Sequence, residues 1–564
     1  MSKVASFFPA TTGFVPAQEN KTRITGPRST TMESAKIALI PCLLPEKQVH
    51  EPFDCAPSTK CNSWGCPSPQ AAGPPREVAI RGAWLGIKKP LVQSDVLQLF
   101  VNKKDLREGS QKLLDIARAN GGNRAFGSGG HNATVDYIYN TLVKLNYYNV
   151  KKQPFTEVFS QGNATLSIDG VRVASEILTY TPGGSVEAPL VAVPNLGCVL
   201  ADYPAEVAGK IAFVSRGTCP FADKSLAAKA AGASAIVIYN NVAGALSGTL
   251  GAPFKDYAPS VGISQEDAAA VLTKLAAGAV TASVKVDAIV EPRTNYNVIA
   301  ETKGGDHNNV LALGGHTDSV AAGPGINDDG SGTIGILNVA KYLSHFRVNN
   351  AVRFLFFGAE EFGLLGSYHY VKSINGSETE LAKIRAYLNF DMIASPNYIY
   401  GIYDGDGSAF NLTGPEGSDL IEKDFENFFK SKRTPSVPSE FSGRSDYAGF
   451  IQNGIPSGGL FTGAEVLKTE EEAKLFGGTA GVAYDVNYHK AGDTIENLNW
   501  EAFVLNTKAI AHSVAKYAVS WKGFPAVNLA KRRYAGDKAK VFKREIETHQ
   551  HDHHSGPCGG GALI

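Results

Sequence analysis

NNVLALGGHTD, residues 308–318, is a short apolar run that ends in polar residues, and it is followed by GSGTIGILNVAKYLSHF (330–346) and AVRFLFFGAEE (351–361). The first and third segments have the length and apolar character of buried strands, whereas the second repeats its apolar residues at helical spacing. AYLNFDMIAS (386–395) indicates a further strand. Strands that alternate with helices of about 10 to 15 residues are typical of βαβ units. The stretch therefore predicts an α/β domain with a mostly parallel, mixed sheet flanked by helices.

Upstream of this stretch the sequence pattern changes twice. Helical spacing runs from Asp95 through VLQLFVNKKDLREGSQKLLDIARAN and returns in ATVDYIYNTLVKL, with NRAFGSGG (123–130) expected as the loop between the two helices. From Tyr147 to about Val290 the pattern predicts short strands and turns, broken by a few helices. Within it, KIAFVSRG, CPFADKSLAAKAAGA and SAIVIYNN predict strand, helix and strand. We therefore expect a β-rich insert near the beginning of the α/β domain.

Length and charge limit the function. A chain of 564 residues has material for more than one domain. Lysine and arginine number 54, as do aspartate and glutamate, so the formal net charge is zero and no global field attracts a polyanion. No stretch approaches the run of about 18 apolar residues that a membrane-spanning helix needs. We therefore expect neither a nucleic-acid partner nor a membrane span.

The two ends of the chain differ from its body. Residues 1–87 are rich in Pro, Ser and Gly, so we interpret them as a poorly ordered leader, a propeptide or a misassigned N-terminus. Residues 523–564 are a polar tail rich in His and Gly, which the core site does not need. Four cysteines of the leader have no C-x-x-C spacing, which argues against a zinc module there: Cys42, Cys55, Cys61 and Cys66.

Five N-x-[ST] sequons are consistent with a secreted or vacuolar protein. No clean signal peptide follows Met1, where IALIPCLL (37–44) is only a faint apolar segment. The sequons begin at Asn20, Asn132, Asn163, Asn375 and Asn411, and we expect glycans on the last four.

Polar residues follow three of the predicted strands at their C-terminal ends, where ligands bind in open α/β sheets. His316 and Asp318 follow the first strand, Glu360 and Glu361 the second, and Asp391 the third. In HTD, Asp318 lies two residues beyond His316 on an extended segment, so its carboxylate can accept the second ring N–H of His316. Adjacent Glu360 and Glu361 point in different directions, so one can bind metal while the other is the general base.

Each residue also has a structural explanation when taken alone. Asp328 or Asp329 can cap the helix that follows, and Glu360 with Glu361 suits a solvated helix start. Their convergence favours a multinuclear metal site, because five carboxylates and the His316 imidazole at one edge repel one another unless cations neutralise them. Imidazole and carboxylate ligands without thiolate suit Zn²⁺, with Co²⁺ or Mn²⁺ as alternatives.

A pair of ions needs a second histidine, and His489, which follows the glycine-rich GGTAGVAYD, is the best remaining candidate. Beside it, Tyr488 would place a phenol near the metals, where it can stabilise an oxyanion. The other histidines of the body are interpreted as packing, surface or loop residues: His345, His369 and His512 in helices, and His131 and His307 in loops.

Four motifs resemble those of the zinc aminopeptidases of peptidase family M28: HTDSVAAGPGINDDGSGT, FFGAEEFGLLGS, NFDMIAS and YHKAGDT. The resemblance covers most of residues 88–522 and is greatest to fungal secreted or vacuolar enzymes of the aminopeptidase Y or leucine aminopeptidase type. It implies two zinc ions, a general base at Glu360 and an orienting carboxylate at Asp318. The implied ligands are His316 and Asp391 for one ion, Glu361 and His489 for the other, and Asp328 for both.

A second resemblance concerns residues 161–290, which are similar to a protease-associated (PA) domain. It implies that the peptidase domain is discontinuous and consists of residues 88–160 and 291–522. Cys198 and Cys219 sit where such a domain in this family carries a disulfide, with two buried thiols as the alternative. The PA domain is expected to shape access to the metal cleft or to bind peptide, or else to be structural.

GRSDYAGF (443–450) resembles a family segment near the substrate site. The resemblance implies that Arg444 helps to fix the substrate backbone, although an arginine in a Ser/Gly loop is as often a surface cation.

The resemblance implies hydrolysis of the first peptide bond of peptides with a free N-terminus. Two alternatives stay open, a carboxypeptidase or glutaminyl-cyclase-like transferase and a non-catalytic binding protein. A carboxypeptidase needs basic residues for the substrate carboxylate, and a cyclase uses a single zinc. The complete set of ligands argues against a binding protein.

Overall fold

The computed structural model describes residues 89–530 and 532. Several sequence-based predictions lie outside these residues: the leader up to residue 87 with Cys42, Cys55, Cys61, Cys66 and Asn20, and the histidines of the C-terminal tail.

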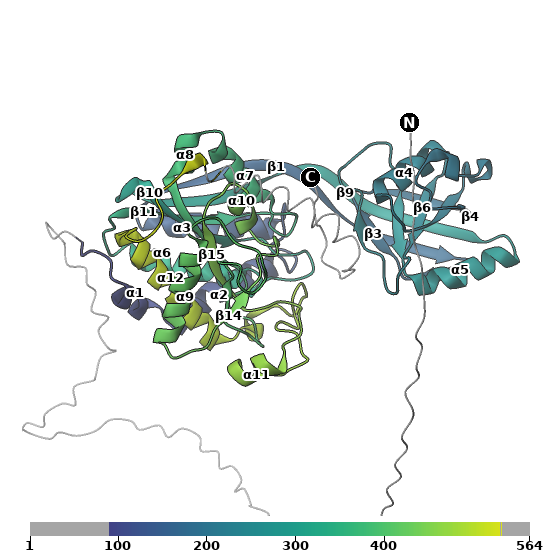
Figure 1. Ribbon diagram of the computed structural model, residues 1–564. Coiled ribbons are helices and arrows are strands. Elements are labelled where there is room, and N and C mark those ends of the chain that lie inside the picture. The colour runs from purple at the N-terminus through teal and green to yellow at the C-terminus, as the bar shows by residue number, and fades with distance from the viewer. Residues whose placement is uncertain (1–88, 531, 533–564) are drawn as a thin grey trace, which may run out of the picture. The chain divides into compact units, whose positions relative to one another are not determined.

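The α/β domain is built on a mixed sheet (Figure 1). Its central strands are parallel, because β10 pairs with β11 and β12, and β12 pairs with β15. The flanking pairs β9–β11 and β13–β15 are antiparallel, so the predicted mixed sheet is confirmed. These strands are β9 (Thr281–Thr302), β10 (Asp306–His316), β11 (Asn350–Phe357), β12 (Ile384–Phe390), β13 (Gly401–Tyr403) and β15 (Ser457–Phe461), and β14 (Val437–Ser439) pairs with β13.

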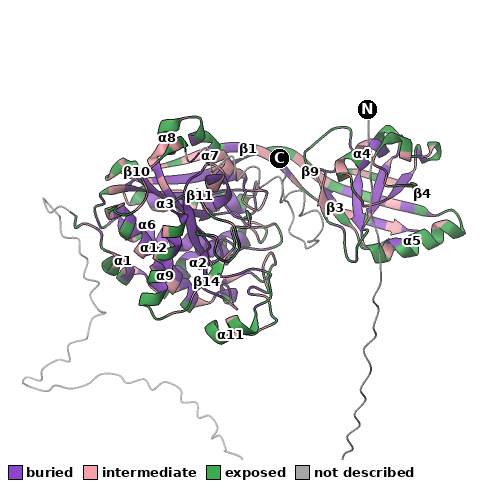
Figure 2. Ribbon diagram, viewed as in Figure 1, coloured by how far each residue is buried: buried purple, intermediate pink, exposed green. Residues whose placement is uncertain are grey.

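Helices cover both faces of this sheet because alternate strand residues face opposite sides. On β10, Leu311 and Leu313 belong to one hydrophobic core and Val310 and Ala312 to another. The first core contains side chains of α1 (Ser94–Phe100), α2 (Lys103–Ala119), α3 (Gly129–Lys144), α6 (Gly330–Leu343), α9 (Ser418–Ser431) and α12 (Trp500–Val519). The second contains side chains of α7 (Leu365–Asn375), α8 (Glu378–Lys383) and α10 (Tyr447–Ile451). Figure 2 shows the central strands buried and exposed residues on the outer sides of the helices.

The β-rich insert has hydrophobic cores of its own. The predicted strand, helix and strand are β5 (Ile211–Ser215), α4 (Phe221–Ala230) and β6 (Ala235–Tyr239). Two long antiparallel strands, β1 (Tyr148–Ile168) and β9, belong both to the insert and to the α/β domain. The remaining insert elements include β2 (Val171–Val173), β3 (Glu176–Thr179), β4 (Gly184–Ala192), β7 (Gly248–Thr249), β8 (Ser260–Ile263) and α5 (Gln265–Ala277).

Some local predictions were wrong because side chains cap helices where periodicity alone gives no boundary. The helical stretch after Asp95 divides at Asn102, whose side chain accepts the N–H of Asp105 (3.0 Å) and starts α2. The predicted loop 123–130 ends early, because Ser128 caps α3 by accepting the N–H of His131 (3.1 Å). His131 is therefore a buried helix residue, and His307 lies in strand β10, so neither is a loop histidine.

His345, His369 and His512 occupy packing or surface positions, as predicted. His369 stacks on Phe155, and His512 bonds through Nδ1 to Ser94 (2.8 Å). His345 packs edge-on against Phe100 but lies just beyond the end of α6, so it was wrongly placed in that helix.

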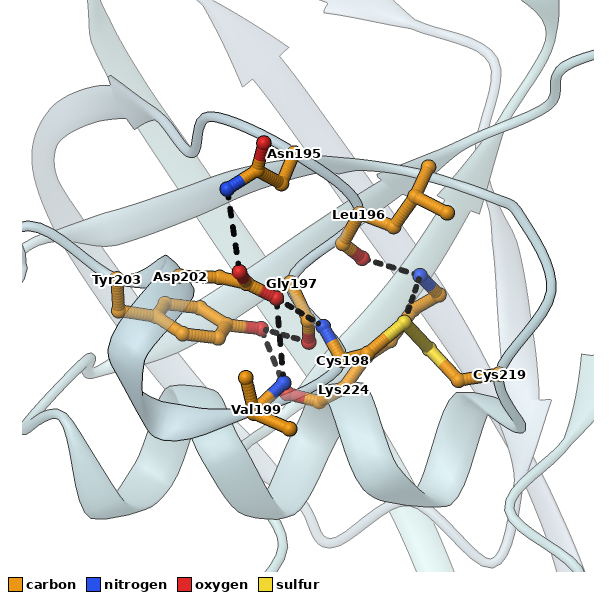
Figure 3. The surroundings of a disulfide bond; sticks show 9 residues. All are labelled: Asn195, Leu196, Gly197, Cys198, Val199, Asp202, Tyr203, Cys219 and Lys224. Atoms are coloured by element: carbon orange, nitrogen blue, oxygen red, sulfur yellow. Dashed lines mark hydrogen bonds between the residues drawn. A yellow bond between two sulfur atoms is a disulfide. The ribbon is translucent and has the colours of Figure 1, made fainter.

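A disulfide joins Cys198 and Cys219 within the insert, as the resemblance implied (Figure 3). The carboxylate of Asp202 accepts the N–H groups of Cys198 (2.8 Å) and Val199 (3.3 Å). On the other side, the buried ammonium of Lys224 donates to the carbonyl of Leu196. The bond ties the loop after β4 to the segment that directly precedes α4.

Replacing both cysteines with serine is expected to destabilise the insert by about 3 kcal/mol, because the bond closes a loop with a sequence separation of 21 residues. The check is urea unfolding followed by a tryptophan placed in the insert, for example at Tyr239. The secondary structure of the protein in the absence of urea should be retained. An unchanged unfolding midpoint would show that the bond contributes no stability.

Candidate metal centre

The predicted ligands come together at the C-terminal edge of the parallel strands. His316 is the last residue of β10, and Asp391 directly follows β12. Glu360 and Glu361 follow the end of β11, and Asp328 precedes α6. His316 is 1% exposed and Asp328 5%. The structure thus gathers residues from four separate segments into one buried cluster.

His316 faces three carboxylates. Its Nε2 lies 3.2 Å from Oδ1 of Asp328, 3.6 Å from Oδ1 of Asp391 and 3.8 Å from Oε2 of Glu360. The groups around His316 whose ligand atoms lie close enough together to hold an ion are His316 with Asp328 and Glu361, and His316 with Asp391 and Asp329.

His489 lies on the other side of Asp328. Its Nε2 is 3.1 Å from Oδ2 of Asp328 and 3.0 Å from Oε2 of Glu361. The two oxygens of Asp328 therefore face two different imidazoles, which is the arrangement a bridging carboxylate needs.

Asp318 lies beside the His316 imidazole that it was predicted to orient, but its carboxylate forms no hydrogen bond with the ring and contacts the neighbouring backbone instead. Its Oδ1 lies 3.6 Å from Nδ1 of His316. The same carboxylate accepts the backbone N–H groups of Glu360 (3.1 Å) and Glu361 (3.3 Å). Asp318 thus links the loops after β10 and β11.

The helix cap belongs to Asp329, not to Asp328. Asp329 accepts the N–H of Gly332 at the start of α6 (2.8 Å), together with the N–H groups of His316 and Met392 (3.1 Å each). Asp493 accepts the N–H of Asp328 (3.0 Å) and so holds the backbone beside it. The side chain of Asp328 therefore remains directed at the two histidines.

A relay of hydrogen bonds holds Asp391. Ser445 donates to Oδ2 of Asp391 (2.6 Å), Asn389 donates to Ser445 (2.8 Å), and Tyr387 donates to Asn389 (2.9 Å). The sequence had drawn attention to the Ser445 segment only for Arg444. Ser445 and the buried Asp446 were missed, and their adjacency to Arg444 was the one available signal.

The electrostatics of the cluster show an excess of negative charge. Burial and the neighbouring Asp391 and Glu361 raise the pKa of Glu360 well above its ordinary value. Burial likewise raises the pKa of Glu361 and of Asp446 to about 7 each. Burial also acts to raise the pKa of Asp328, but hydrogen bonds from the two histidines outweigh it and lower that pKa.

The donor set fits zinc. Glu361 Oε1 and Asp391 Oδ1 are buried oxygens that no hydrogen-bond donor reaches within residues 89–530. A buried carboxylate oxygen without a donor is costly unless a cation compensates it. Three carboxylates and two imidazoles, without a thiolate, form the shell that zinc accepts.

Arg444 and Tyr488 lie next to this cluster. The ring of Tyr488 stacks on His489 with centroids 3.8 Å apart, and its hydroxyl accepts a hydrogen bond from Arg444 (3.3 Å). Arg444 also pairs with Glu465 (2.7 Å), and its side chain is 49% exposed. The structure therefore places both residues at the rim of the centre.

A further acidic group lies in another part of the domain. Its members Asp404, Asp406 and Glu422 accept N–H groups of the loop 405–410, which explains their proximity without an ion.

The sequon residues within the described part of the chain are all exposed: Asn132, Asn163, Asn375 and Asn411. None of the helices that the structure describes is long and apolar enough to cross a membrane.

Two family profiles match the chain. The one described as peptidase family M28 matches residues 297–514, and the one described as PA domain matches residues 186–271.

Curated relatives match over most of the chain. It is 55% identical over 465 residues to a probable leucine aminopeptidase 2 of Aspergillus fumigatus, covering 82% of this chain and 92% of that protein. It is 51% identical over 473 residues to leucine aminopeptidase 2 of Arthroderma otae, covering 84% of this chain and 93% of that protein.

Solved structures are similar in fold. An aminopeptidase from Aneurinibacillus sp. strain AM-1 matches with a TM-score of 0.59 and 29% identity, over 75% of this chain and 96% of that one. A zinc aminopeptidase from Bacillus subtilis matches with a TM-score of 0.56 and 26% identity, over 76% and 97%.

Proposed function

The chain belongs to peptidase family M28, and we propose that it is an aminopeptidase that hydrolyses the first peptide bond of peptides at a centre of two zinc ions. The observation that carries the proposal is the position of Asp328, whose two carboxylate oxygens lie 3.2 Å from His316 and 3.1 Å from His489. Asp328 would bridge the two ions, with His316 and Asp391 holding one and Glu361 and His489 the other.

Zinc bound there supplies a water of lowered pKa and polarises the scissile carbonyl. Glu360 accepts the proton of the attacking water and donates it to the leaving amine. Its buried position beside the other carboxylates raises its pKa, and a raised pKa suits a residue that must both accept and donate a proton near neutral pH. Asp318 accepts the backbone N–H of Glu360 and so fixes the position from which the Glu360 carboxylate extends toward the water.

Tyr488 stabilises the oxyanion that forms on the scissile carbonyl. Arg444 holds the Tyr488 hydroxyl from one side while its own position is fixed by Glu465. Arg444 is in reach to bind the substrate backbone from the rim. The surplus of buried carboxylates favours a cationic α-amino group in the site, which accounts for a requirement for a free N-terminus.

The alternative activities fit less well. A carboxypeptidase needs a basic group for the substrate carboxylate, but the rim cation Arg444 is paired with Glu465, so the pair has no net positive charge. A single-zinc cyclase does not account for a carboxylate shared between His316 and His489. A non-catalytic binding protein does not account for the buried carboxylate of Glu360, which lies farther from His316 than the carboxylates of Asp328 and Asp391.

We also propose that the protein is secreted or vacuolar. The Cys198–Cys219 disulfide favours an oxidising compartment, and the four exposed sequons are accessible to glycans. The PA domain is proposed to shape peptide access to the centre.

The test compares leucyl-p-nitroanilide with its N-acetylated form in a protein whose zinc has been measured by mass spectrometry. We expect about two zinc ions per chain and turnover of the free-amine substrate that is lost after chelation and returns with zinc. Acetylation is expected to lower kcat/KM by about 10³-fold or more, because it removes the charged group that the carboxylates hold. Equal turnover of both substrates would rule out an aminopeptidase, and a single tightly bound zinc would rule out the dinuclear centre.

A further inference from the structure

The loop 317–325 joins two of the proposed zinc ligands, His316 and Asp328, and wraps around the side chain of Arg124. We propose that Arg124 is a positioning residue of the metal centre, whose guanidinium holds this loop in the conformation that aims both ligands at the ions. This proposal rests on the proposed dinuclear site. From the sequence, the segment that contains Arg124 was predicted only as a loop between two helices.

Three carbonyls of the loop accept hydrogen bonds from the guanidinium. Nη1 donates to Thr317, Nε donates to Pro324 (2.9 Å), and Nη2 donates to Gly325 (2.5 Å). Arg124 is completely buried, so no water competes for these bonds. The contacts lie at both ends of the loop, so one planar group sets the separation of the ends.

The backbone of the loop is adapted to this contact. The N–H of Arg124 donates to Oγ of Ser319 (2.9 Å), and that hydroxyl lies 2.9 Å from the carbonyl of Gly323. Gly325 has a φ of +60°, and a Cβ there would lie 2.3 Å from the carbonyl oxygen of Asp328 and 3.2 Å from Nη2 of Arg124. A side chain at Gly325 would therefore displace the ligand segment from the guanidinium.

Thr317, between the ligand His316 and the orienting Asp318, is held from a second side. Its hydroxyl donates to the carbonyl of Phe357 (2.7 Å) and so accepts from Nε2 of His131 (2.8 Å). Adjacent side chains on extended backbone point to opposite sides. Fixing Thr317 on the side of His131 therefore directs His316 and Asp318 to the side of the metals.

Arg124 also brings a permanent positive charge to the cluster. Burial lowers the pKa of its guanidinium, whereas Asp318 and Asp329 act to raise it, and an arginine remains protonated under such conditions. The loop is therefore expected to keep its shape when the zinc is removed, so that the ligands are arranged before the ions bind.

The test is Arg124→Lys in the full-length protein. Lysine keeps the charge, but one ammonium cannot reach both ends of the loop. We expect the zinc dissociation constants, measured by competition with a chromophoric chelator, to rise about 10- to 100-fold. At saturating zinc, kcat should fall about 10-fold or more while KM stays within a factor of about three, because the variant misplaces groups that act on the reacting atoms and leaves the substrate contacts at the rim.

Arg532→Lys is the matched control. Arg532 is also a buried arginine that donates to backbone carbonyls, those of Leu381 (3.0 Å) and Ile384 (2.8 Å), but it contacts no proposed ligand. It should leave zinc affinity and kcat unchanged even if it lowers the melting temperature. Zinc affinity equal to wild type in Arg124→Lys, or an equal loss in both variants, would overturn the proposal.

His131→Phe provides a second measurement if Arg124→Lys does not fold. It removes the donor to Thr317 without changing the charge of the cluster, and a smaller loss of zinc affinity in the same direction is expected. Unchanged affinity would contradict the role of the Thr317 anchor. Failure of the dinuclear site itself would be recognised separately, because wild type would then bind fewer than two zinc ions.

Discussion

Glu360→Gln is expected to lower kcat by about 10²- to 10⁴-fold while the zinc content stays at its wild-type value. Glutamine has the size of glutamate and can still accept a hydrogen bond, but it cannot take a proton from water. Glu360 lies 3.8 Å from Nε2 of His316, farther than Asp328 at 3.2 Å or Asp391 at 3.6 Å. This order of distances agrees with the proposal that Glu360 acts on the water while Asp328 and Asp391 hold ions.

The neighbouring Glu361→Gln is the matched control, because the two glutamates differ by one position and share the same burial. Glu361 Oε2 lies 3.0 Å from Nε2 of His489, so its loss should reduce zinc content. The pair is measured by zinc analysis and steady-state kinetics on the same preparations. If Glu360→Gln loses zinc and Glu361→Gln keeps it, the assignments of base and ligand are exchanged.

The sequence predicted the sheet and its reactive edge because both follow from local patterns. Apolar runs identify the strands, and a parallel strand delivers the residue after it to one edge. His316, Glu360 and Asp391 were found in this way. The choice between Asp328 and Asp329 as helix cap was open, because adjacent aspartates satisfy the same local rule and only the folded backbone shows which carboxylate meets the amides.

Residues that support the site were missed because their partners are distant in the chain. Ser445 and Asp391 are in contact although they lie 54 residues apart in the sequence, and Arg124 and Thr317 lie 193 residues apart. Neither residue type has a periodic or motif signal that indicates such a partner. His131 was wrongly assigned to a loop for a related reason, since a glycine-rich segment hides the cap at Ser128 that starts its helix. Contacts of this kind depend on how segments that are distant in the sequence pack in the folded chain.

Asp328→Asn is expected to abolish tight binding of both zinc ions and to reduce kcat/KM below about 10⁻⁴ of wild type, the scale of loss when the metal-activated nucleophile is removed. Its two oxygens are divided between His316 and His489, so each ion loses a charged ligand at once. An amide keeps the size of the side chain but offers one neutral oxygen. The losses of zinc binding and of kcat/KM should be larger than in Asp391→Asn, which removes a charged ligand from one ion only.

Thermal unfolding provides a readout that is independent of catalysis. A ligand that binds the folded state at 1,000 times its dissociation constant stabilises that state by about 4 kcal/mol. Wild type should therefore melt at a higher temperature with zinc than after chelation, and Asp328→Asn should lose this difference. Asp404→Asn is the control, since Asp404 is a buried aspartate whose carboxylate accepts the backbone N–H groups of Ser408, Ala409 and Phe410. A variant of Asp328 that keeps two zinc ions and the zinc-dependent shift would show that another residue bridges the metals. Asp329 is then the first to examine, because its carboxylate lies close to possible ligand atoms of His316 and Asp391.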